Sequence, residues 1–317
     1  MNIVAVEPIG IKEDKYRELK EKFQNLGHNF LMFSDRQESD EILIERLKDA
    51  EIAIISNIKL TKDVMSHCPK LKMLSVAFTG VDHIDLDYCR SANISVCNAS
   101  GYATEAVSEL ALALMLNVYR NIVELDNKTR CGEGRDGFLG RQIHGKTVGI
   151  VGTGAIGCRT ASILRNFSCK VVAWSRTKKQ ELINSGVEYI SLEELLTISD
   201  IISLHLPLNK DTYHIISEEK LRLCKPDAIL INTARGDVVD MQALAFALKN
   251  KKIAGAGIDV FEKEPPLPKD HLLLNLPNCI VTPHVAYATE EAFAARIDIV
   301  VNNIESWLAG KAINLIV

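Results

Sequence analysis

Short apolar runs alternate with amphipathic segments along the first hundred residues. The apolar runs are rich in β-branched residues and have the length of buried strands, whereas the segments between them repeat their apolar positions at helical spacing. Strands that alternate with helices in this way predict a parallel α/β layer. The apolar runs lie at 3–6, 52–55, 71–77 and 94–96, and the amphipathic segments lie at 16–26 and 42–47.

A second alternation follows a long segment with one apolar face and a glycine-rich loop. Across residues 104–123, apolar side chains such as Val107, Leu110 and Leu114 recur at helical spacing and predict one long helix. The strands and helices beyond the loop predict a doubly wound parallel sheet, and a last helix is expected at 290–308. The strands of this part are expected at 148–151, 171–174, 201–204, 228–231, 254–258 and 280–281.

The composition is that of an ordinary globular chain, and it narrows the possible partners. Hydrophobic residues make up 47% and charged residues 25% of the 317 residues, which excludes disordered and collagen-like chains and is typical of about two domains. The 37 basic and 41 acidic residues leave a net charge of −4, so no basic excess favours nucleic acid. The apolar run at 110–116 is far shorter than the ~20 residues of a membrane span, and no membrane partner is expected.

The amino-terminal residues and the cysteines indicate in which cellular compartment the protein is expected. Residues 1–8 lack the cationic start and the cleavage site of a signal peptide, and their pattern is that of a buried strand. The eight cysteines include no Cys-x-x-Cys pair, which favours neither a metal site nor a disulfide framework. We therefore expect a cytoplasmic protein with free thiols and no bound metal.

The clearest motif is a Gly-x-Gly-x-x-Gly fingerprint that stands between an expected strand and an expected helix. The first glycine permits a tight turn, the second lets the backbone approach a pyrophosphate, and the third lets the helix pack closely on the strand. The amino terminus of the helix then binds the anion. The dinucleotide site predicted in this way consists of Gly152, Gly154, Ala155, Ile156 and Gly157.

The residues after the next strand indicate which dinucleotide binds. A strand that binds NAD usually ends in an acidic residue, which accepts hydrogen bonds from the ribose hydroxyls. Here Ser175, Arg176 and Thr177 follow the strand, and this turn has no carboxylate. Arg176 and the two hydroxyls can instead bind a 2′-phosphate, although a solvated arginine on a turn is the plainer alternative. We expect NADP as the leading cofactor and NAD as the alternative.

Three further segments add the chemistry of an enzyme. Arg235, a carboxylate of the segment 259–265, and His284 each follow the carboxyl end of an expected parallel strand, where ligands bind in such sheets. A guanidinium binds a substrate carboxylate through two hydrogen bonds and polarises the neighbouring carbonyl, while an imidazolium donates a proton. The carboxylate keeps the histidine charged and oriented. Any one of these residues alone is more simply a structural ion pair or a strand cap, but together they favour reduction of a 2-oxoacid.

These segments resemble the family of D-isomer-specific 2-hydroxyacid dehydrogenases, and the resemblance covers nearly the whole chain. Besides the fingerprint and the three catalytic segments, it includes the segments 79–85, 101–107 and 204–208. The family implies a Rossmann-type doubly wound parallel sheet inserted into a smaller, flavodoxin-like α/β substrate domain. It also implies a homodimer that forms through the cofactor domain.

The domain boundaries expected from this resemblance divide the chain in three. Residues 1–99 form the first part of the substrate domain, and residues 100–288 form the dinucleotide-binding domain. Residues 289–317 supply a helix that returns to the substrate domain. The substrate domain is therefore expected to be discontinuous in sequence.

The resemblance also assigns roles to individual residues. Arg235 is implied to be catalytic and to bind the substrate carboxylate, and Glu264 is implied to pair with His284, the catalytic acid–base residue. Backbone amides around Thr79 and Gly80 are implied to hold the same carboxylate. The residues implied to line the cofactor cleft, besides the fingerprint and the turn after the second strand, are Thr104, Pro207, Thr212, Thr233, Ala234 and Asp259.

The leading interpretation is an oxidoreductase that transfers a hydride from NAD(P)H to a small 2-oxoacid, hydroxypyruvate or glyoxylate, and so forms a D-2-hydroxyacid. Within the family, the alternative is D-3-phosphoglycerate dehydrogenase. Members with that substrate carry basic residues after the second or third strand, whereas only Lys59 is evident there in this chain. The alternative from another class is a non-catalytic, dinucleotide-sensing corepressor, which would use extended tails that this sequence does not show.

Overall fold

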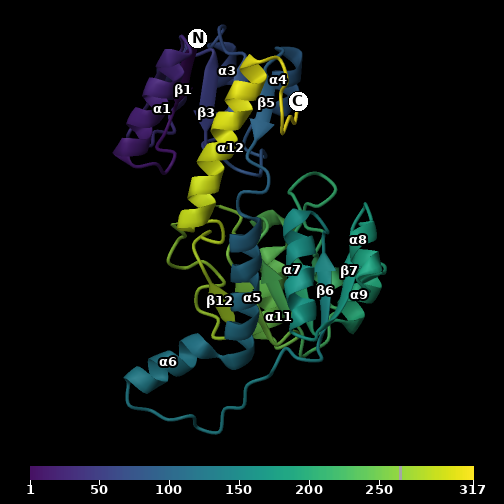
Figure 1. Cartoon of the computed structure of the whole chain (residues 1–317). Helices are drawn as coiled ribbons and strands as arrows, with labels where there is room; N and C mark the ends of the chain where they lie inside the picture. The colour runs from purple at the N-terminus through teal and green to yellow at the C-terminus, as the bar shows by residue number, and fades with distance from the viewer. Residues whose placement is uncertain (264–265) are drawn as a thin grey trace. The chain divides into compact units, whose positions relative to one another are not determined.

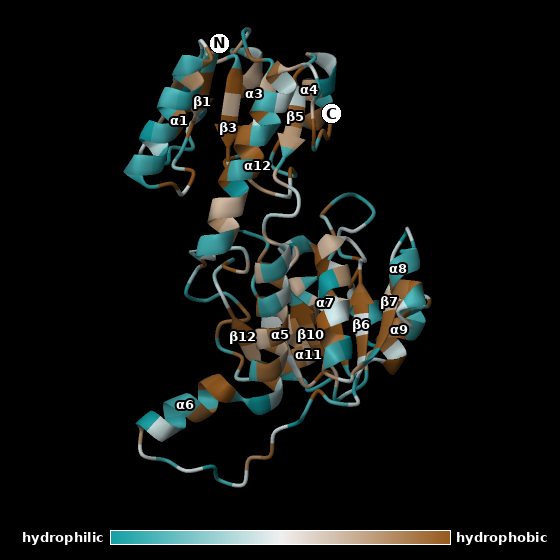
Figure 2. Cartoon of the chain, viewed as in Figure 1, coloured by the Kyte–Doolittle hydropathy of each residue, from teal (hydrophilic) through white to brown (hydrophobic). Residues whose placement is uncertain are grey.

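The structure is a computed structural model that describes residues 1–263 and 266–317, and the chain divides into two compact units (Figure 1). The first unit comprises Met1–Ala103 and Thr289–Val317, and the second comprises Thr104–Ala288. Each unit is built on a parallel sheet flanked by helices, which confirms the predicted α/β architecture. Within each unit the strands are mostly apolar and the outer faces of the helices are mostly polar (Figure 2).

The first unit has a five-stranded sheet. Its strands are β1 (Asn2–Ala5), β2 (Asn29–Met32), β3 (Ile52–Ile55), β4 (Met73–Val76) and β5 (Ser95–Asn98), and its helices are α1 (Glu13–Asn25), α2 (Asp40–Leu47), α3 (Lys62–Ser66), α4 (Leu86–Ser91) and α12 (Glu290–Leu308). The strand order is β2-β1-β3-β4-β5. Helix α12 packs on β4 and β5, where Asn303 Nδ2 donates to the Asn98 carbonyl at 2.9 Å and Ser75 Oγ donates to the Val300 carbonyl at 3.2 Å. Distant parts of the sequence therefore complete one layer.

The second unit has a seven-stranded sheet. Its strands are β6 (Thr147–Val151), β7 (Lys170–Trp174), β8 (Glu188–Tyr189), β9 (Ile201–Leu204), β10 (Ile229–Asn232), β11 (Gly255–Ile258) and β12 (Cys279–Val281), and its helices are α5 (Thr104–Arg120), α6 (Ile122–Arg130), α7 (Ala155–Asn166), α8 (Gln180–Asn184), α9 (Leu192–Ile198), α10 (Glu218–Leu221) and α11 (Met241–Lys249). The strand order is β12-β11-β10-β9-β6-β7-β8. Strands β7 and β8 are added on one side of β6 and strands β9 to β12 on the other, so the order of the strands reverses between β6 and β9. Such a switch point is where open α/β sheets bind their ligands.

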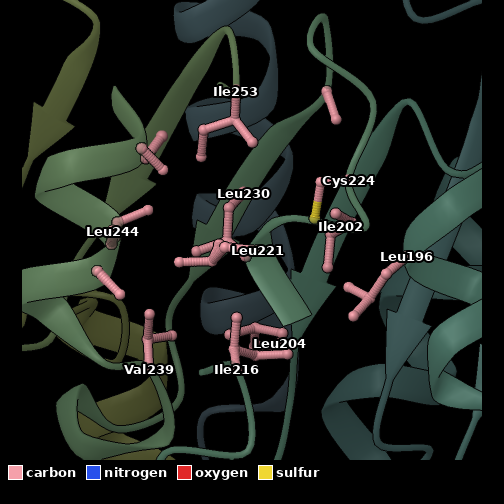
Figure 3. Packing of buried hydrophobic residues seen from close by; sticks show 14 of the residues in the cluster. Leu196, Ile202, Leu204, Ile216, Leu221, Cys224, Leu230, Val239, Leu244 and Ile253 are labelled. Atoms are coloured by element: carbon pink, nitrogen blue, oxygen red, sulfur yellow. The ribbon is translucent and has the colours of Figure 1, made fainter. Parts of the chain in front are cut away.

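Apolar side chains cover both faces of the second sheet. One cluster lies under α9, α10 and α11 and includes Leu196, Leu221 and Leu244 (Figure 3). The other lies under α5 and α7 and includes Leu114 and Leu164. Burial on both faces explains why the central strands are nearly continuous apolar runs instead of alternating ones.

The expectation of one helix over 104–123 is wrong. Helix α5 ends at Arg120, and Asn121 takes a left-handed conformation with φ 50° and ψ 42° before α6 begins. Helix α6 buries none of its residues, so its apolar positions near 122 do not belong to the face that α5 packs on the sheet. Within the described ranges, no single helix is long and apolar enough to cross a bilayer, and α5 and α6 reach that length and hydropathy only together, across a 59° bend.

Candidate active site

The carboxyl ends of three neighbouring strands lead to the residues predicted to be catalytic. Strands β10, β11 and β12 are parallel, and Asn232, Ile258 and Val281 lie side by side at their ends. Arg235 follows the first of these strands and His284 follows the last. The sheet therefore brings both segments to the edge that the sequence predicts.

Arg235 is held by contacts within the loop that follows β10. The buried Asn232 side chain accepts a hydrogen bond from the Ala234 amide at 3.0 Å and donates one to the Arg235 carbonyl at 2.9 Å. A guanidinium nitrogen of Arg235 donates to the Ala234 carbonyl at 2.8 Å. The next residue is Gly236, where a Cβ would lie 2.0 Å from the carbonyl carbon of Phe261. Only glycine allows the segment that bears Arg235 to pack directly on the backbone that leaves β11.

Asp259 holds the loop that carries His284. Its buried carboxylate accepts hydrogen bonds from Thr282 Oγ1 at 2.6 Å and from the amides of Val285 and Ala286, both at 2.9 Å. Burial raises the pKa of Asp259, and these hydrogen bonds act in the opposite direction. His284 has a φ of 54°, a left-handed conformation that is costly for most residues, so the loop around it must be firmly held. The family resemblance places Asp259 at the cofactor cleft. In the structure, both of its carboxylate oxygens accept hydrogen bonds from the loop that carries His284.

Glu264, the predicted partner of His284, lies outside the described residues, so their pairing stays a prediction. Glu262 is exposed, and its Oε2 lies 3.3 Å from Nε2 of His271. The His284 ring meets the Tyr287 ring edge to face, with centroids 5.4 Å apart. The backbone of its loop and the Tyr287 ring are therefore among the features that orient the His284 side chain.

The glycine loop between β6 and α7 leaves room for an anion. Gly152 has a φ of 97°, and a Cβ there would lie 2.5 Å from the His205 carbonyl oxygen, while a Cβ at Gly157 would lie 2.0 Å from the Gly152 carbonyl oxygen. Gly154 differs, because no described atom lies within 4 Å of its Cβ position. It is also the N-cap of α7, whose first turn has no acidic residue and no side-chain cap. This open, uncapped helix start fits the pyrophosphate of a dinucleotide.

The loop that follows β7 is anchored to the glycine loop at both ends. The first glycine of the fingerprint donates its amide hydrogen to the Trp174 carbonyl at 2.8 Å, and Thr153 Oγ1 donates to the Thr177 carbonyl at 3.3 Å. Between these anchors, the Arg176 guanidinium lies 3.4 Å from the Asp211 carboxylate, with the two side chains 70% and 75% exposed. Such an exposed ion pair contributes little, so Arg176 can turn toward a phosphate. No pattern in the sequence indicates that Asp211 lies beside Arg176.

The remaining residues expected at the cofactor cleft differ in their contacts. Thr233 Oγ1 is buried and has no hydrogen-bond partner among the described residues, so a polar group of a bound cofactor can satisfy it. Thr212 Oγ1 donates to the Pro207 carbonyl at 2.6 Å and so stabilises its own loop. Thr104 opens α5, and its carbonyl accepts a hydrogen bond from Ser108 Oγ at 2.7 Å. The open glycine loop and the unsatisfied Thr233 hydroxyl together fit a nicotinamide dinucleotide.

Thr79 and Gly80 belong to the first unit, where they follow β4. Asn98 Nδ2 donates to the Thr79 carbonyl at 2.7 Å, which fixes the loop against the end of β5. In the part of the chain that the structure describes, the amides of Thr79 and Gly80 donate to no protein acceptor. The loop thus offers two N–H donors to an anion, and their binding of the substrate carboxylate stays a prediction.

Comparisons with known proteins agree with this arrangement. The family model described as D-isomer specific 2-hydroxyacid dehydrogenase, NAD binding domain, matches residues 112–286. A glyoxylate reductase from Thermococcus litoralis is 42% identical over 281 residues, which are 85% of this chain and 84% of that protein. A glycerate dehydrogenase from Methylorubrum extorquens is 39% identical over 302 residues, which are 92% of this chain and 93% of that protein.

A solved structure shows the same fold over the full length. It is an acyclic imino acid reductase in complex with NADPH and D-Arg, and it superposes with a TM-score of 0.91 at 34% identity over 100% of both chains. The carboxyl-edge site, the glycine loop, the family model and the relatives all indicate an NAD(P)-dependent oxidoreductase that acts on CH–OH groups. The chain belongs to the D-isomer-specific 2-hydroxyacid dehydrogenase family.

Proposed function

We propose that this oxidoreductase reduces glyoxylate and hydroxypyruvate to the corresponding hydroxyacids. The observation that carries the proposal is the position of Arg235 and His284, which follow two strands at the carboxyl edge of a sheet that also bears the glycine loop. Relatives named glyoxylate reductase and glycerate dehydrogenase, at about 40% identity, support this choice of substrates.

In the proposed reaction, the chain binds the 2-oxoacid and supplies the proton. A bound nicotinamide cofactor supplies the hydride to the carbonyl carbon. Arg235 binds the substrate carboxylate through two hydrogen bonds. That the amides of Thr79 and Gly80 bind the same carboxylate stays a prediction from the family resemblance. The His284 imidazolium donates its proton to the carbonyl oxygen as that oxygen gains negative charge, and Glu264 orients the ring.

Basic side chains in the first unit help to decide whether the substrate carries a phosphate, as 3-phosphoglycerate does. Besides Lys59, which the sequence suggested, the structure adds Arg36 as a second basic residue after a strand of this sheet. However, Arg36 Nη1 lies 2.6 Å from a carboxylate oxygen of the buried Glu7 and 2.6 Å from Oδ1 of Asn57. A substrate phosphate would have to compete with Glu7 for this guanidinium. We therefore favour an unphosphorylated substrate.

A substrate panel tests the proposed function. Initial rates should be measured with glyoxylate, hydroxypyruvate, pyruvate, D-glycerate and 3-phosphoglycerate, and with a 2-oxoacid plus ammonia because one relative of known structure is an imino acid reductase. We expect the fastest reduction with hydroxypyruvate or glyoxylate, and His284→Ala should lose most of kcat. Faster turnover of 3-phosphoglycerate than of D-glycerate would contradict the proposal, and turnover of no compound would indicate a dinucleotide-sensing binding protein.

For the cofactor, we propose NADPH over NADH. The turn that follows β7 carries Arg176 and no carboxylate, and a charge-assisted contact to a 2′-phosphate contributes about 1.5 to 3 kcal/mol when the side chain is well held. The comparison is kcat/KM for the two cofactors in the wild type and in Arg176→Ala. A wild-type preference for NADH would refute the proposal, as would a preference for NADPH that survives in the variant.

We also propose that the protein is a cytoplasmic homodimer. All eight cysteines are free thiols, which suits a reducing compartment.

The surface proposed for the dimer contact is in the second unit. Helix α6 and the loop after it reach away from the second sheet (Figure 1) and expose Ile122, Val123 and Leu139, the last at 79%. A hollow of about 310 Å³ at the amino ends of β10 to β12 is partly lined by Leu139. Sedimentation should show a dimer, and Leu139→Asp should shift it toward monomer; a monomeric wild type would refute this assembly.

A further inference from the structure

We propose that Tyr189 is a positioning residue that sets the loop 175–179 for recognition of a 2′-phosphate. This inference rests on the proposed preference for NADPH. Tyr189 lies on β8, the edge strand next to β7, and is not one of the residues that the sequence singled out. Its hydroxyl links two loops that approach the cofactor site from different strands.

The link is a chain of hydrogen bonds that runs in one direction. The Lys179 amide donates to Tyr189 Oη at 3.0 Å, Tyr189 Oη donates to Thr153 Oγ1 at 3.0 Å, and Thr153 Oγ1 donates to the Thr177 carbonyl at 3.3 Å. Each hydroxyl thus donates once and accepts once. The chain begins and ends on the same loop, and it passes through the buried Thr153 of the glycine fingerprint.

This arrangement fixes the backbone on which Arg176 stands. On one side of Arg176, the Trp174 carbonyl is bonded to the fingerprint, and on the other side the Tyr189 chain holds residues 177–179. Ser175 and Arg176 therefore span two fixed points. The Arg176 side chain itself is 70% exposed, and its contact with Asp211 is long and solvated. The backbone, and not a side-chain partner, therefore determines where the guanidinium can reach.

The loop also concentrates positive charge. Arg176, Lys178 and Lys179 are three cations within four residues, and all three are exposed. The Tyr189 hydroxyl holds the amide of the last of them. When the backbone of the loop is held, the points from which these three side chains extend are fixed, whereas a loose loop spreads them over many conformations. The inferred role therefore affects the 2′-phosphate contact and leaves the rest of the dinucleotide unaffected.

Two substitutions break the chain at different points. Tyr189→Phe removes the hydroxyl and keeps the ring, and Thr153→Val removes the second hydroxyl at nearly constant volume. Tyr119→Phe is the matched control, because Tyr119 Oη also donates one hydrogen bond in the second unit, to the Asp200 carbonyl at 3.2 Å, at the other end of the sheet. Melting temperatures of the three variants show whether each one folds.

The measurement is the dissociation constant by titration calorimetry for NADP⁺, NAD⁺ and adenosine 2′,5′-bisphosphate. In Tyr189→Phe and Thr153→Val, binding of NADP⁺ and of the bisphosphate should weaken by about five- to tenfold, the loss typical of one hydrogen bond of ordinary strength. In Tyr189→Phe, binding of NAD⁺ should change by less than about twofold, and Tyr119→Phe should bind all three ligands as the wild type does.

The outcomes separate this inference from the cofactor proposal on which it rests. Equal losses for NADP⁺ and NAD⁺ in Tyr189→Phe, or unchanged NADP⁺ binding in both loop variants, would overturn the role of Tyr189 even though the wild type prefers NADP⁺. Failure of the cofactor proposal appears earlier, as a wild-type protein that binds NAD⁺ more tightly. That result would overturn the inference together with its premise.

Discussion

Gly236→Ala tests how closely two segments of the active site must pack. A Cβ at this position would lie 2.0 Å from the carbonyl carbon and 2.1 Å from the carbonyl oxygen of Phe261, and 2.6 Å from the amide nitrogen of Glu262. Ordinary contacts begin at 3.4 Å, so the shortest contact requires a separation of 3.4 − 2.0 = 1.4 Å. All three atoms belong to the backbone, and no side chain can rotate to relieve the clash.

The separation acts directly on Arg235, which precedes Gly236. A displacement of about 1 Å in the geometry of a reacting complex can lower the rate about 100-fold, so we expect kcat/KM for the 2-oxoacid to fall by about that factor. Overpacking of this kind also costs about 1 to 3 kcal/mol of unfolding free energy. The rate should therefore suffer far more than the fold.

The assay is steady-state reduction followed by cofactor absorbance, together with the melting temperature. Gly134→Ala is the matched control, because no described atom lies within 4 Å of its Cβ position and its φ is not in the left-handed region. It should keep the wild-type kcat/KM. Wild-type kcat/KM in Gly236→Ala would refute the reasoning, since the segments would then tolerate the extra atom without loss of geometry.

Other substitutions test separate parts of the site. Asp259→Asn replaces an acceptor of the His284 loop with an N–H₂ group that faces amide donors, so kcat should fall more than tenfold and the melting temperature should drop; an unchanged kcat would show that the loop holds itself. Gly157→Ala should abolish NADP⁺ binding in calorimetry, because its Cβ would lie 2.0 Å from a backbone oxygen, and retained affinity would contradict the packing argument. Arg235→Lys should lower kcat/KM at least tenfold, because an ammonium cannot form the two parallel hydrogen bonds that a planar guanidinium makes to a carboxylate, and equal rates would exclude that contact. Burial lowers the pKa of His205 from 6.5 to about 4, so the unfolded chain binds more protons between these values and the unfolding free energy decreases as the pH falls through them. The full shift corresponds to about 3 kcal/mol, and about 2 kcal/mol of it is lost between pH 7.5 and pH 5; the residual solvent contact of His205 reduces both figures. Urea titrations at these two pH values should show the partial loss in the wild type and not in His205→Gln, and equal losses in both would refute it.

The sequence predicted those parts of the site that depend on local pattern. The glycine fingerprint follows an apolar strand, and Arg235 and His284 follow two others, so the parallel sheet was enough to place them at one edge. The same reasoning placed the last helix at 290–308, where the structure has α12. In each case, the residues that decide the structure are neighbours in sequence.

Other features depended on contacts that no pattern shows. Ile122 and Val123 continue the apolar spacing of α5, so nothing in the periodicity indicates that Asn121 takes a left-handed conformation and ends the helix. Strand β8 has only two residues, too few for a period, which is why Tyr189 was missed. The partners of Asp259 come from a loop more than twenty residues away, and only the folded chain brings them together.

The origin of the first unit in two separate stretches of sequence has a consequence for folding during synthesis. Every strand of the second unit lies between residues 104 and 288, so that sheet needs no residue from either end of the chain. Strand β5 must wait, because its free edge is covered only when residues 314–317 arrive and the Ile316 amide donates to the Val96 carbonyl at 2.8 Å. Until then, β4 and β5 lack both α12 and this tail, and an uncovered strand edge promotes aggregation. Nascent chains stalled before residue 289 should therefore depend on chaperones for the first unit alone.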